Sequence, residues 1–147
     1  MVELRSFTRE DAECLRENLY PDMTPDELAA LIVEWNRGSY QGKLFEMLAV
    51  VADGRVTGFV SLLAHSRSVV SFGAEIFPAE RRKGYAGAAL RLMLARAADL
   101  GFRVAQTQVR TDNEASRRLN EKLGFESDGY VYKNAKGRDV VLYLKAL

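Results

Sequence analysis

The sequence has very few of the residues that bind metals or form covalent cross-links. It contains one cysteine, Cys14, and one histidine, His65, among 147 residues. A single cysteine excludes an internal disulfide and is typical of proteins in a reducing compartment. A single histidine cannot supply the pair of imidazoles found in many zinc sites. We therefore expect no metal centre, and we interpret Cys14 as a helical core residue and His65 as a surface residue.

Long apolar runs and an excess of charge of one sign are also absent. No stretch stays apolar over the ~20 residues that a membrane-spanning helix needs, and no apolar segment typical of a signal peptide opens the chain. The 21 Lys and Arg residues nearly cancel the 20 Asp and Glu residues, which leaves a net charge of +1. Bulk charge therefore favours neither a nucleic acid nor a membrane as partner. These features predict a cytoplasmic protein, and the length suits one domain, residues 1–147.

Hydrophobic periodicity predicts strands and helices in one mixed domain. Apolar and alternating runs predict seven strands, at residues 2–7, 45–52, 55–63, 69–77, 104–109, 126–133 and 138–144. Apolar residues at helical spacing predict about four helices, which follow Thr8, Thr24, Gly84 and Thr111. The expected order is β-α-α-β-β-β-α-β-α-β-β.

Local signals predict several of the connections. Asp53-Gly54 lies between two apolar runs and is typical of a two-residue hairpin, so its flanking strands should be antiparallel. The helix after Gly84 should bring the next strand parallel to the strand before it. Thr111 and Glu114 form a candidate capping box for the last helix. The expected fold class is α+β, with a mixed, mostly antiparallel seven-stranded sheet.

The segment before the third helix has the composition of an anion-binding turn. Pro78 ends a strand, the basic residues Arg81-Arg82-Lys83 follow, and Gly84 precedes the helix. Unpaired N–H groups and the dipole at a helix N-terminus favour a phosphate. Glycine lets the backbone approach such a ligand closely. The sequence therefore predicts a phosphorylated ligand at this turn.

Two nucleotide-binding loops are alternatives for the turn, and neither fits. A Walker loop needs Gly-Lys followed by a hydroxyl residue, whereas Lys83 precedes Gly84 here. A dinucleotide fingerprint needs a second glycine where this chain has Ala86. It also needs an acidic residue near the end of the next strand, which closes with Arg110.

Two motifs together resemble those of a known enzyme family. Arg81-x-x-Gly84-x-Ala86 resembles the acetyl-CoA signature of the GNAT superfamily of N-acetyltransferases, Arg/Gln-x-x-Gly-x-Gly/Ala. Residues 113–125 are similar to that family's penultimate helix and end in its Leu-Gly-Phe motif. The order of elements also agrees, so the resemblance covers nearly the whole chain. It implies a GNAT-like fold and an acyltransferase that moves an acetyl group from acetyl-CoA to a primary amine of a small molecule, protein or peptide N-terminus.

The resemblance also implies which residues hold acetyl-CoA. The cosubstrate should lie where strand 69–77 separates from strand 104–109, with its pyrophosphate at the turn. The residues expected to bind it are Ala74, Glu75, Ile76, Arg81, Arg82, Lys83, Gly84, Tyr85, Ala86, Gly87, Asn113 and Ser116. Helical spacing independently places Asn113, Ser116 and Asn120 on one polar stripe. An N-cap role for Asn113 and a surface position for Ser116 are the ordinary alternatives.

The implied reaction is direct attack of the amine on the thioester, without a covalent enzyme intermediate. A base must take the proton of the amine. Glu75 is the best candidate, because strand alternation places it on one face with Ser71 and Gly73, which leave room for a ligand. An ion pair with an arginine is the alternative role for Glu75. The backbone N–H of Ile76 is the expected donor to the oxyanion.

The sequence does not identify the acid that protonates the departing thiolate. Many relatives have a tyrosine where this chain has Asn120, and some place a glutamate base where it has Gln108. An amide has no titratable proton, so Tyr130, Tyr132 or water would serve, and we name Tyr130 as the candidate. This departure leaves open a non-catalytic acyl-CoA-binding regulatory module as an alternative function.

The remaining expectations concern partners. Nucleic-acid binding through the basic cluster is disfavoured, because the total charge is balanced and no aromatic stacking platform is evident. In the family, the two early helices and the final strands wall the acceptor site, here about residues 19–39 and 129–138. The sequence does not identify the acceptor, and it leaves open a homodimer formed through the C-terminal strands.

Overall fold

The computed structural model describes residues 1–147 and has an α+β architecture. Its helices are α1 (Ala12–Asn18), α2 (Pro25–Trp35), α3 (Tyr85–Asp99) and α4 (Glu114–Lys122), with short 3-10 turns η1 (Arg9–Asp11) and η2 (Pro78–Glu80). Its strands are β1 (Val2–Ser6), β2 (Ser39–Tyr40), β3 (Lys43–Ala52), β4 (Arg55–Ala64), β5 (Val69–Ile76), β6 (Val104–Arg110), β7 (Val131–Lys133) and β8 (Asp139–Ala146). Except for the two-residue β2, the helices and strands follow the predicted order. None of the helices has the length and hydropathy to cross a membrane.

The strands form one mixed sheet in the order β1-β3-β4-β5-β6-β8-β7, with β2 paired to β3. β5 and β6 are parallel, as expected for strands joined through α3, and all the other pairs are antiparallel. The predicted hairpin at Asp53-Gly54 is confirmed, since both residues have positive φ, 51° and 76°, as the favoured two-residue turn requires. The predicted mixed and mostly antiparallel sheet is therefore confirmed.

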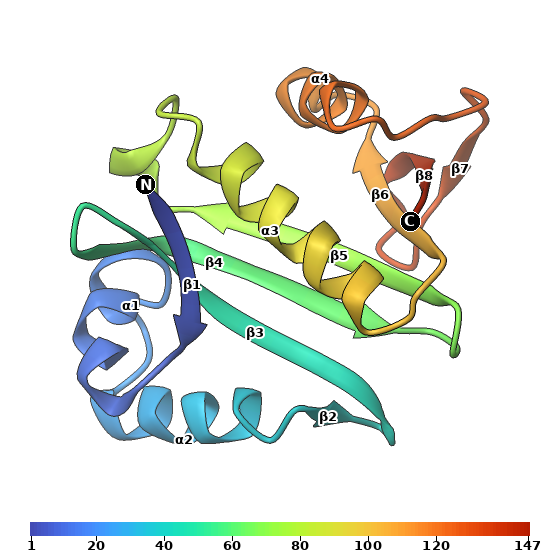
Figure 1. Ribbon diagram of the computed structural model, residues 1–147. Coiled ribbons are helices and arrows are strands. Elements are labelled where there is room, and N and C mark those ends of the chain that lie inside the picture. The colour runs from blue at the N-terminus through green and yellow to red at the C-terminus, as the bar shows by residue number, and fades with distance from the viewer.

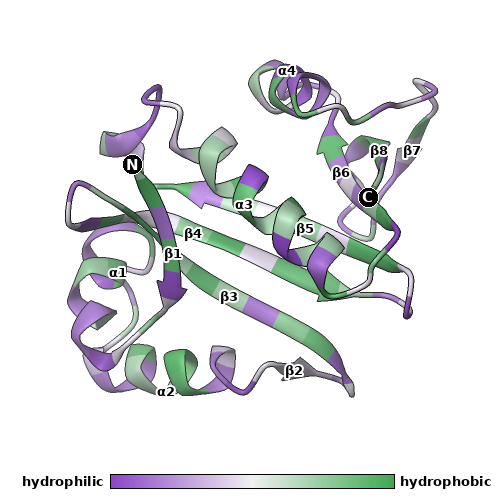
Figure 2. Ribbon diagram, in the orientation of Figure 1, coloured by the Kyte–Doolittle hydropathy of each residue, from purple (hydrophilic) through white to green (hydrophobic).

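Helices cover both faces of the sheet, as Figure 1 shows. On one face α3 packs across the central strands, with Met93 and Ala97 fully buried against Val60 and Val70. On the other face α1 and α2 form a second apolar cluster, in which Leu15 is fully buried. The long central strands are accordingly mainly hydrophobic in Figure 2, whereas the turns are hydrophilic. Burial of each valine, leucine or methionine side chain named here stabilises the fold by about 1.5–3 kcal/mol relative to exposure.

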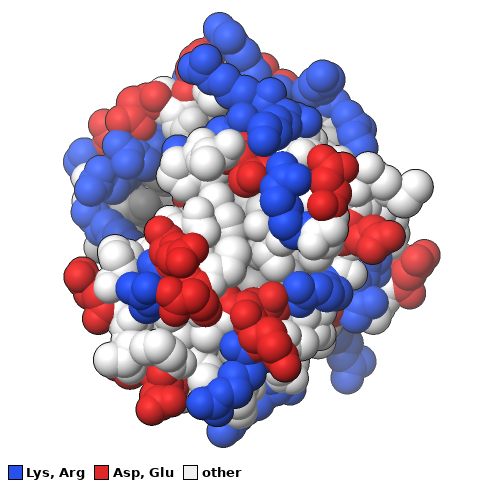
Figure 3. Space-filling model, turned by 90° about the vertical axis from the view of Figure 1, so that its left-hand side faces the viewer, with Lys and Arg blue, Asp and Glu red and all other residues white.

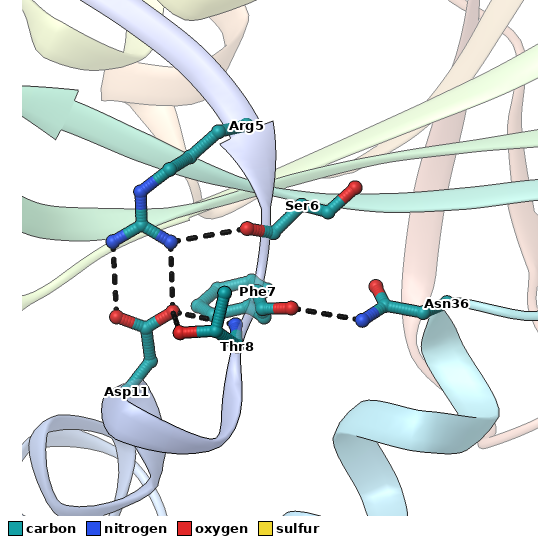
Figure 4. Close-up of polar contacts among 6 residues, drawn as sticks. All are labelled: Arg5, Ser6, Phe7, Thr8, Asp11 and Asn36. Atoms are coloured by element: carbon teal, nitrogen blue, oxygen red, sulfur yellow. Dashed lines mark hydrogen bonds and ion pairs between the residues drawn. The ribbon is translucent and has the colours of Figure 1, made fainter.

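A hydrogen-bond network joins the end of β1 to the two early helices (Figure 4). Arg5 donates to both carboxylate oxygens of Asp11, at 2.8 and 3.0 Å. The N–H of Thr8 also donates to this carboxylate at 2.8 Å, and Asn36 at the end of α2 donates to the carbonyl of Phe7 at 2.8 Å. Burial raises the pKa of Asp11, but the hydrogen bonds and charge of Arg5 and the Thr8 N–H outweigh it and lower the pKa.

Asp11→Asn is expected to lower the free energy of unfolding by about 1–2 kcal/mol at neutral pH, because a charge-assisted hydrogen bond is lost at a nearly buried site. The folded-state pKa of Asp11 lies below the ordinary value. The difference in the free energy of unfolding between wild type and variant should therefore be largest above about pH 5, and it should shrink as the pH falls through the folded-state pKa of Asp11. Urea denaturation from neutral to acid pH measures this difference.

Asp26→Asn is the control for this prediction. Asp26 also pairs with an arginine, Arg9, at 3.4 Å, but its side chain is 92% exposed. Its replacement should cost less than about 0.5 kcal/mol, since exposed ion pairs contribute little. If the two substitutions lowered the free energy of unfolding equally at neutral pH, the hydrogen-bond network of Asp11 would have no structural role.

The N-cap of the last helix lies two residues after the predicted one. Its N-cap is Asn113, whose Oδ1 accepts a hydrogen bond from the N–H of Ser116 at 3.1 Å. The prediction that Thr111 caps this helix together with Glu114 is therefore wrong. The N–H of Thr111 instead donates to the carbonyl of Asp139 at 3.1 Å, so Thr111 remains bonded to β8. Asparagine is as good a capping residue as threonine, so the sequence was compatible with two different starts of this helix.

The predicted strand at 126–133 is only partly formed. β7 begins at Val131, and before it a single bridge joins Glu126 to β8. Between them the hydroxyl of Ser127 accepts a hydrogen bond from the N–H of Gly129 at 3.1 Å. Such side-chain turns bond the backbone locally and compete with strand pairing. The prediction of one strand over residues 126–133 did not take this local competition into account.

Candidate functional site

Strands β5 and β6 separate after three residue pairs. Their ladder ends at Ser71 and Gln106, whereas β5 stays paired with β4 as far as Ile76. Just beyond the last pair, the hydroxyl of Thr107 donates to the carbonyl of Phe72 at 3.4 Å. From there the edge of β5 that faces β6 has no partner strand, and the two strands diverge in Figure 1. This opening between residues 73–76 and 107–110, which we call the splay, is where the sequence predicted the two strands to part.

Backbone groups of alternate β5 residues point into the splay. The N–H of Phe77 donates to the carbonyl of Thr57 on β4 at 2.8 Å. Backbone bonding alternates from side to side along a strand, so the N–H and C=O groups of Ala74 and Ile76 point away from β4. The free edge of β5 thus offers donors and acceptors to an extended ligand, as an exposed strand edge does to a peptide.

The splay continues into a cleft of about 520 Å³ between β5, α3 and α4. Of the residues predicted to bind the cosubstrate, those that line the cleft are Ala74, Glu75, Ile76, Arg81, Arg82, Gly84, Tyr85, Ala86, Gly87, Asn113 and Ser116. The remaining predicted residue, Lys83, points its amine to Glu80 at 3.4 Å and does not line the cleft. No His, Cys, Asp and Glu side chains are grouped here or elsewhere so as to hold a metal ion.

One end of the cleft is closed by the N-terminus of α3. Gly84 is the N-cap of this helix, in the left-handed conformation with a φ of 81°, and no side chain caps the first turn. The N–H groups of the first turn therefore have no acceptor within the helix. A Cβ on Gly87 would lie 3.3 Å from Leu119 of α4, so a small residue keeps the two helices at their observed separation. This end of the cleft has the donors and the dipole that an anion requires.

Positive charge is concentrated towards this end of the molecule. Figure 3 views the molecule from the left-hand side of Figure 1, and Lys and Arg side chains form the largest group at its top, whereas in its middle they alternate with Asp and Glu. The turn between η2 and α3 lies in the upper part of Figure 1. The Lys and Arg side chains at the top of this face therefore lie at the same level as the turn between η2 and α3, although the whole chain is nearly neutral.

Ion pairs fasten the turn to the sheet. Arg55 donates to both oxygens of Glu80, at 3.0 and 2.7 Å, and this hydrogen bonding lowers the pKa of Glu80. Arg81 donates from Nε to the carbonyl of Ile76 and from Nη2 to Glu75 Oε1, each at 3.0 Å. The alternative role that we gave to Glu75, an ion pair with an arginine, is thus present in the structure.

The polar stripe of α4 faces the cleft, as helical spacing predicted. Asn113, Ser116 and Asn120 all line it. Asn120 is 6% exposed, and its amide donates to the carbonyl of Ser116 at 2.8 Å and to its hydroxyl at 3.4 Å. Asn120 therefore holds Ser116 in place and presents no titratable group to the cleft.

The two candidate catalytic side chains are not brought together. Glu75 is 43% exposed at the splay. Tyr130 is 69% exposed outside the cleft and stacks on Tyr132 with ring centroids 6.5 Å apart. The role of Tyr130 as an acid thus stays a prediction. Burial raises the pKa of Tyr20, and the charge of Glu75 raises it further, so a tyrosine of the α1–α2 connection is electrostatically coupled to Glu75, a coupling that no motif indicated.

A glycine of β4 is required for the shape of the splay, and sequence reasoning missed it. A Cβ on Gly58 would lie 2.1 Å from the carbonyl oxygen of Glu75 and 2.8 Å from the Cα of Ile76. No side chain fits at this distance, so only glycine lets the end of β5 lie this close to β4. Glycine inside a predicted strand signals a close backbone approach, but the sequence does not say which backbone approaches.

Comparisons with known proteins agree with this geometry. A family model described as an acetyltransferase (GNAT) domain matches residues 2–126. YokL, an uncharacterised N-acetyltransferase from the SPbeta prophage of Bacillus subtilis (strain 168), is 29% identical over 103 residues, which are 68% of this chain. The chain spans 58% of the length of that curated relative.

Solved structures share the fold. RimJ of Mycobacterium smegmatis, in complex with CoA-disulfide, superposes with a TM-score of 0.85 at 17% identity, over 99% of this chain and 81% of that one. RimL, a ribosomal L7/L12 alpha-N-protein acetyltransferase in complex with coenzyme A, superposes with a TM-score of 0.84 at 18% identity, over 99% and 94% of the two chains.

Proposed function

Because the chain belongs to the GNAT acetyltransferase family, we propose that it is an acyltransferase that moves an acetyl group from acetyl-CoA to a primary amine by direct attack. The observation that carries the proposal is the cleft, which joins the uncapped N-terminus of α3 to the free backbone edge of β5. The CoA-bound relatives RimJ and RimL, which share the fold, support acetyl-CoA as the donor.

The residues of the cleft divide into binding and chemical roles. The N–H groups of the turn from Arg82 to Gly87 would hold the pyrophosphate, with Lys83 adding positive charge nearby. Ala74 would bond the pantetheine arm along the strand edge, and Ile76 would contact its thioester end through the N–H alone, since Arg81 bonds the carbonyl of Ile76. Asn113 and Ser116 would contact this arm from α4. These roles agree with the anion preference of helix N-termini.

The chemistry is assigned to the end of β5. Glu75 would take the proton of the amine, directly or through water. The N–H of Ile76 would donate to the oxyanion of the tetrahedral intermediate. Tyr130, Tyr132 or water would return a proton to the thiolate, because Asn120 has none to give.

Acetyl-CoA is expected to bind the purified protein in calorimetry, and thiol release is expected with one class of amine. The panel consists of small amines, polyamines, amino acids, aminoglycosides and peptide N-termini. Gly87→Leu should weaken acetyl-CoA binding at least about 10-fold, a loss of about 1.4 kcal/mol, because the new side chain enters the space between α3 and α4. Arg91→Leu adds the same side chain to the exposed face of α3 and should leave binding unchanged.

Two outcomes would contradict the proposal. If acetyl-CoA does not bind, the cleft has been misassigned. If acetyl-CoA binds but no amine releases thiol, the alternative of a non-catalytic acyl-CoA-binding module is favoured instead.

A further inference from the structure

One guanidinium makes two hydrogen bonds to the end of β5. Arg81 lies five residues beyond Ile76, where the chain leaves η2 and enters the turn. Its Nε donates to the carbonyl of Ile76 and its Nη2 to the carboxylate of Glu75, both at 3.0 Å. The planar guanidinium has its donors in a rigid fork. The carbonyl of Ile76 and the carboxylate of Glu75 are therefore held in a defined relation to each other.

The hydrogen bond from Arg81 to the carbonyl of Ile76 replaces the bond that a neighbouring strand would otherwise make. The carbonyl of Ile76 points into the splay, where β6 no longer pairs with β5. A backbone carbonyl at this position would otherwise lack a protein partner, and the end of β5 would be held from the β4 side alone. Arg81 supplies the missing partner on the splay side.

Gly58 lets the preceding peptide unit, between Glu75 and Ile76, lie close to β4 on the opposite side. The carbonyl oxygen of Glu75 lies over Gly58, where a Cβ would be only 2.1 Å away. The peptide between Glu75 and Ile76 is planar and trans, so its N–H points opposite to its C=O. With the carbonyl fixed over β4, the N–H of Ile76 is aimed into the splay. Gly58 thus lets the Glu75–Ile76 peptide lie against β4, while Arg81 bonds the next carbonyl along the strand, that of Ile76, and the Glu75 carboxylate from the splay side.

We propose that Arg81 is a positioning residue, which holds Glu75 and the Ile76 peptide in their reactive orientation, and that its side chain is not a phosphate ligand. The inference rests on the proposed function, in which Glu75 is the base and Ile76 the oxyanion donor. Two of the five N–H donors of Arg81 are already bonded to Ile76 and Glu75, and the next residue, Arg82, also lines the cleft. The first residue of the acetyl-CoA signature thereby connects the cosubstrate turn to the strand on which the chemistry is assigned.

The two roles of Arg81 predict different kinetics. A phosphate ligand binds ground state and transition state equally, so its loss raises KM and leaves kcat unchanged, whereas loss of a positioning residue lowers kcat. Arg81→Ala should therefore lower kcat by about 100-fold, which corresponds to about 2.7 kcal/mol, with the KM and dissociation constant of acetyl-CoA changed by less than about 3-fold.

A double-mutant cycle tests whether Arg81 acts through Glu75. In a Glu75→Gln background, Arg81→Ala should cost less than about 10-fold in kcat, because residues that act as a unit are not additive. Arg96→Ala is the matched control. Arg96 is also a half-exposed arginine bonded to a glutamate, Glu46 at 2.9 Å, but it lies outside the cleft, and its loss should leave kcat within about 3-fold.

Each other outcome overturns the inference. An increase in the dissociation constant of acetyl-CoA that matches the loss in kcat/KM would make Arg81 a phosphate ligand. If Arg81→Ala lowered kcat by the full 100-fold in both the wild-type and the Glu75→Gln protein, Arg81 would not act through Glu75. An inactive wild-type protein would instead refute the proposed function, and thermal melts of each variant separate both cases from loss of folding.

Discussion

Replacement of Glu75 by glutamine is expected to lower kcat by about 10²- to 10⁴-fold, the usual contribution of general acid–base catalysis. Glutamine has the same shape but cannot accept the proton of the amine. The backbone groups of the turn and of Ile76 are not altered, so the dissociation constant of acetyl-CoA should stay within about 3-fold. Initial rates of thiol release and calorimetry with acetyl-CoA measure the two quantities separately.

The control for this substitution is Glu46→Gln. Glu46 is bonded by an arginine as Glu75 is, with Arg96 Nε 2.9 Å from its carboxylate, but it lies outside the cleft. Its replacement should leave kcat unchanged. If Glu75→Gln retained full activity while the wild type acetylates an amine, another group would be the base, and the ion pair with Arg81 would be the only role of Glu75.

Gly58→Ala is expected to be strongly destabilising, by about 3 kcal/mol, at the upper end of the range for overpacking. The new methyl group would lie 2.1 Å from a backbone oxygen, so β5 would have to move away from β4. Displacement of β5 towards the splay would also narrow the cleft. Urea denaturation gives the change in the free energy of unfolding, and calorimetry gives the affinity for acetyl-CoA.

Gly73→Ala is the matched control, because Gly73 lies on β5 itself. Its added Cβ would meet the hydroxyl of Ser61 at 2.9 Å, and this side chain can rotate away. The cost should be below about 1 kcal/mol, since alanine also restricts the unfolded chain. Similar costs at the two glycines would show that the contact of β5 with β4 at Gly58 is more adaptable than the structure indicates.

Much of the fold was predictable because its signals are local. Hydrophobic period distinguishes strands from helices, and turn residues such as Asp53-Gly54 mark where the chain reverses. The errors occurred where two local signals compete. Thr111 and Asn113 are both good N-caps, and the Ser127 turn lies within residues 126–133, which were predicted as one strand. Small free-energy differences decide between two helix starts, or between a turn and a strand, and the sequence pattern does not show these differences.

The candidate site was predictable where a motif determines the backbone. The Gly84 turn, the uncapped first turn of α3 and the polar stripe of α4 depend on residues near in sequence, and they line one cleft as expected. The coupling of Tyr20 to Glu75 was not predictable, because the two residues are 55 positions apart in the chain (75 − 20) and no periodicity connects them.

The sequence by itself determined the order of elements, the anion-binding turn and the family, because each of these follows from residues within one or two turns of chain. Only the tertiary structure decided how the end of β5 is held. Gly58 of β4 leaves room for the Glu75–Ile76 peptide, and Arg81 bonds the Ile76 carbonyl and the Glu75 carboxylate from the splay. These contacts depend on which strands become neighbours and where two of them part, and that is fixed by packing of the whole sheet rather than by any local pattern.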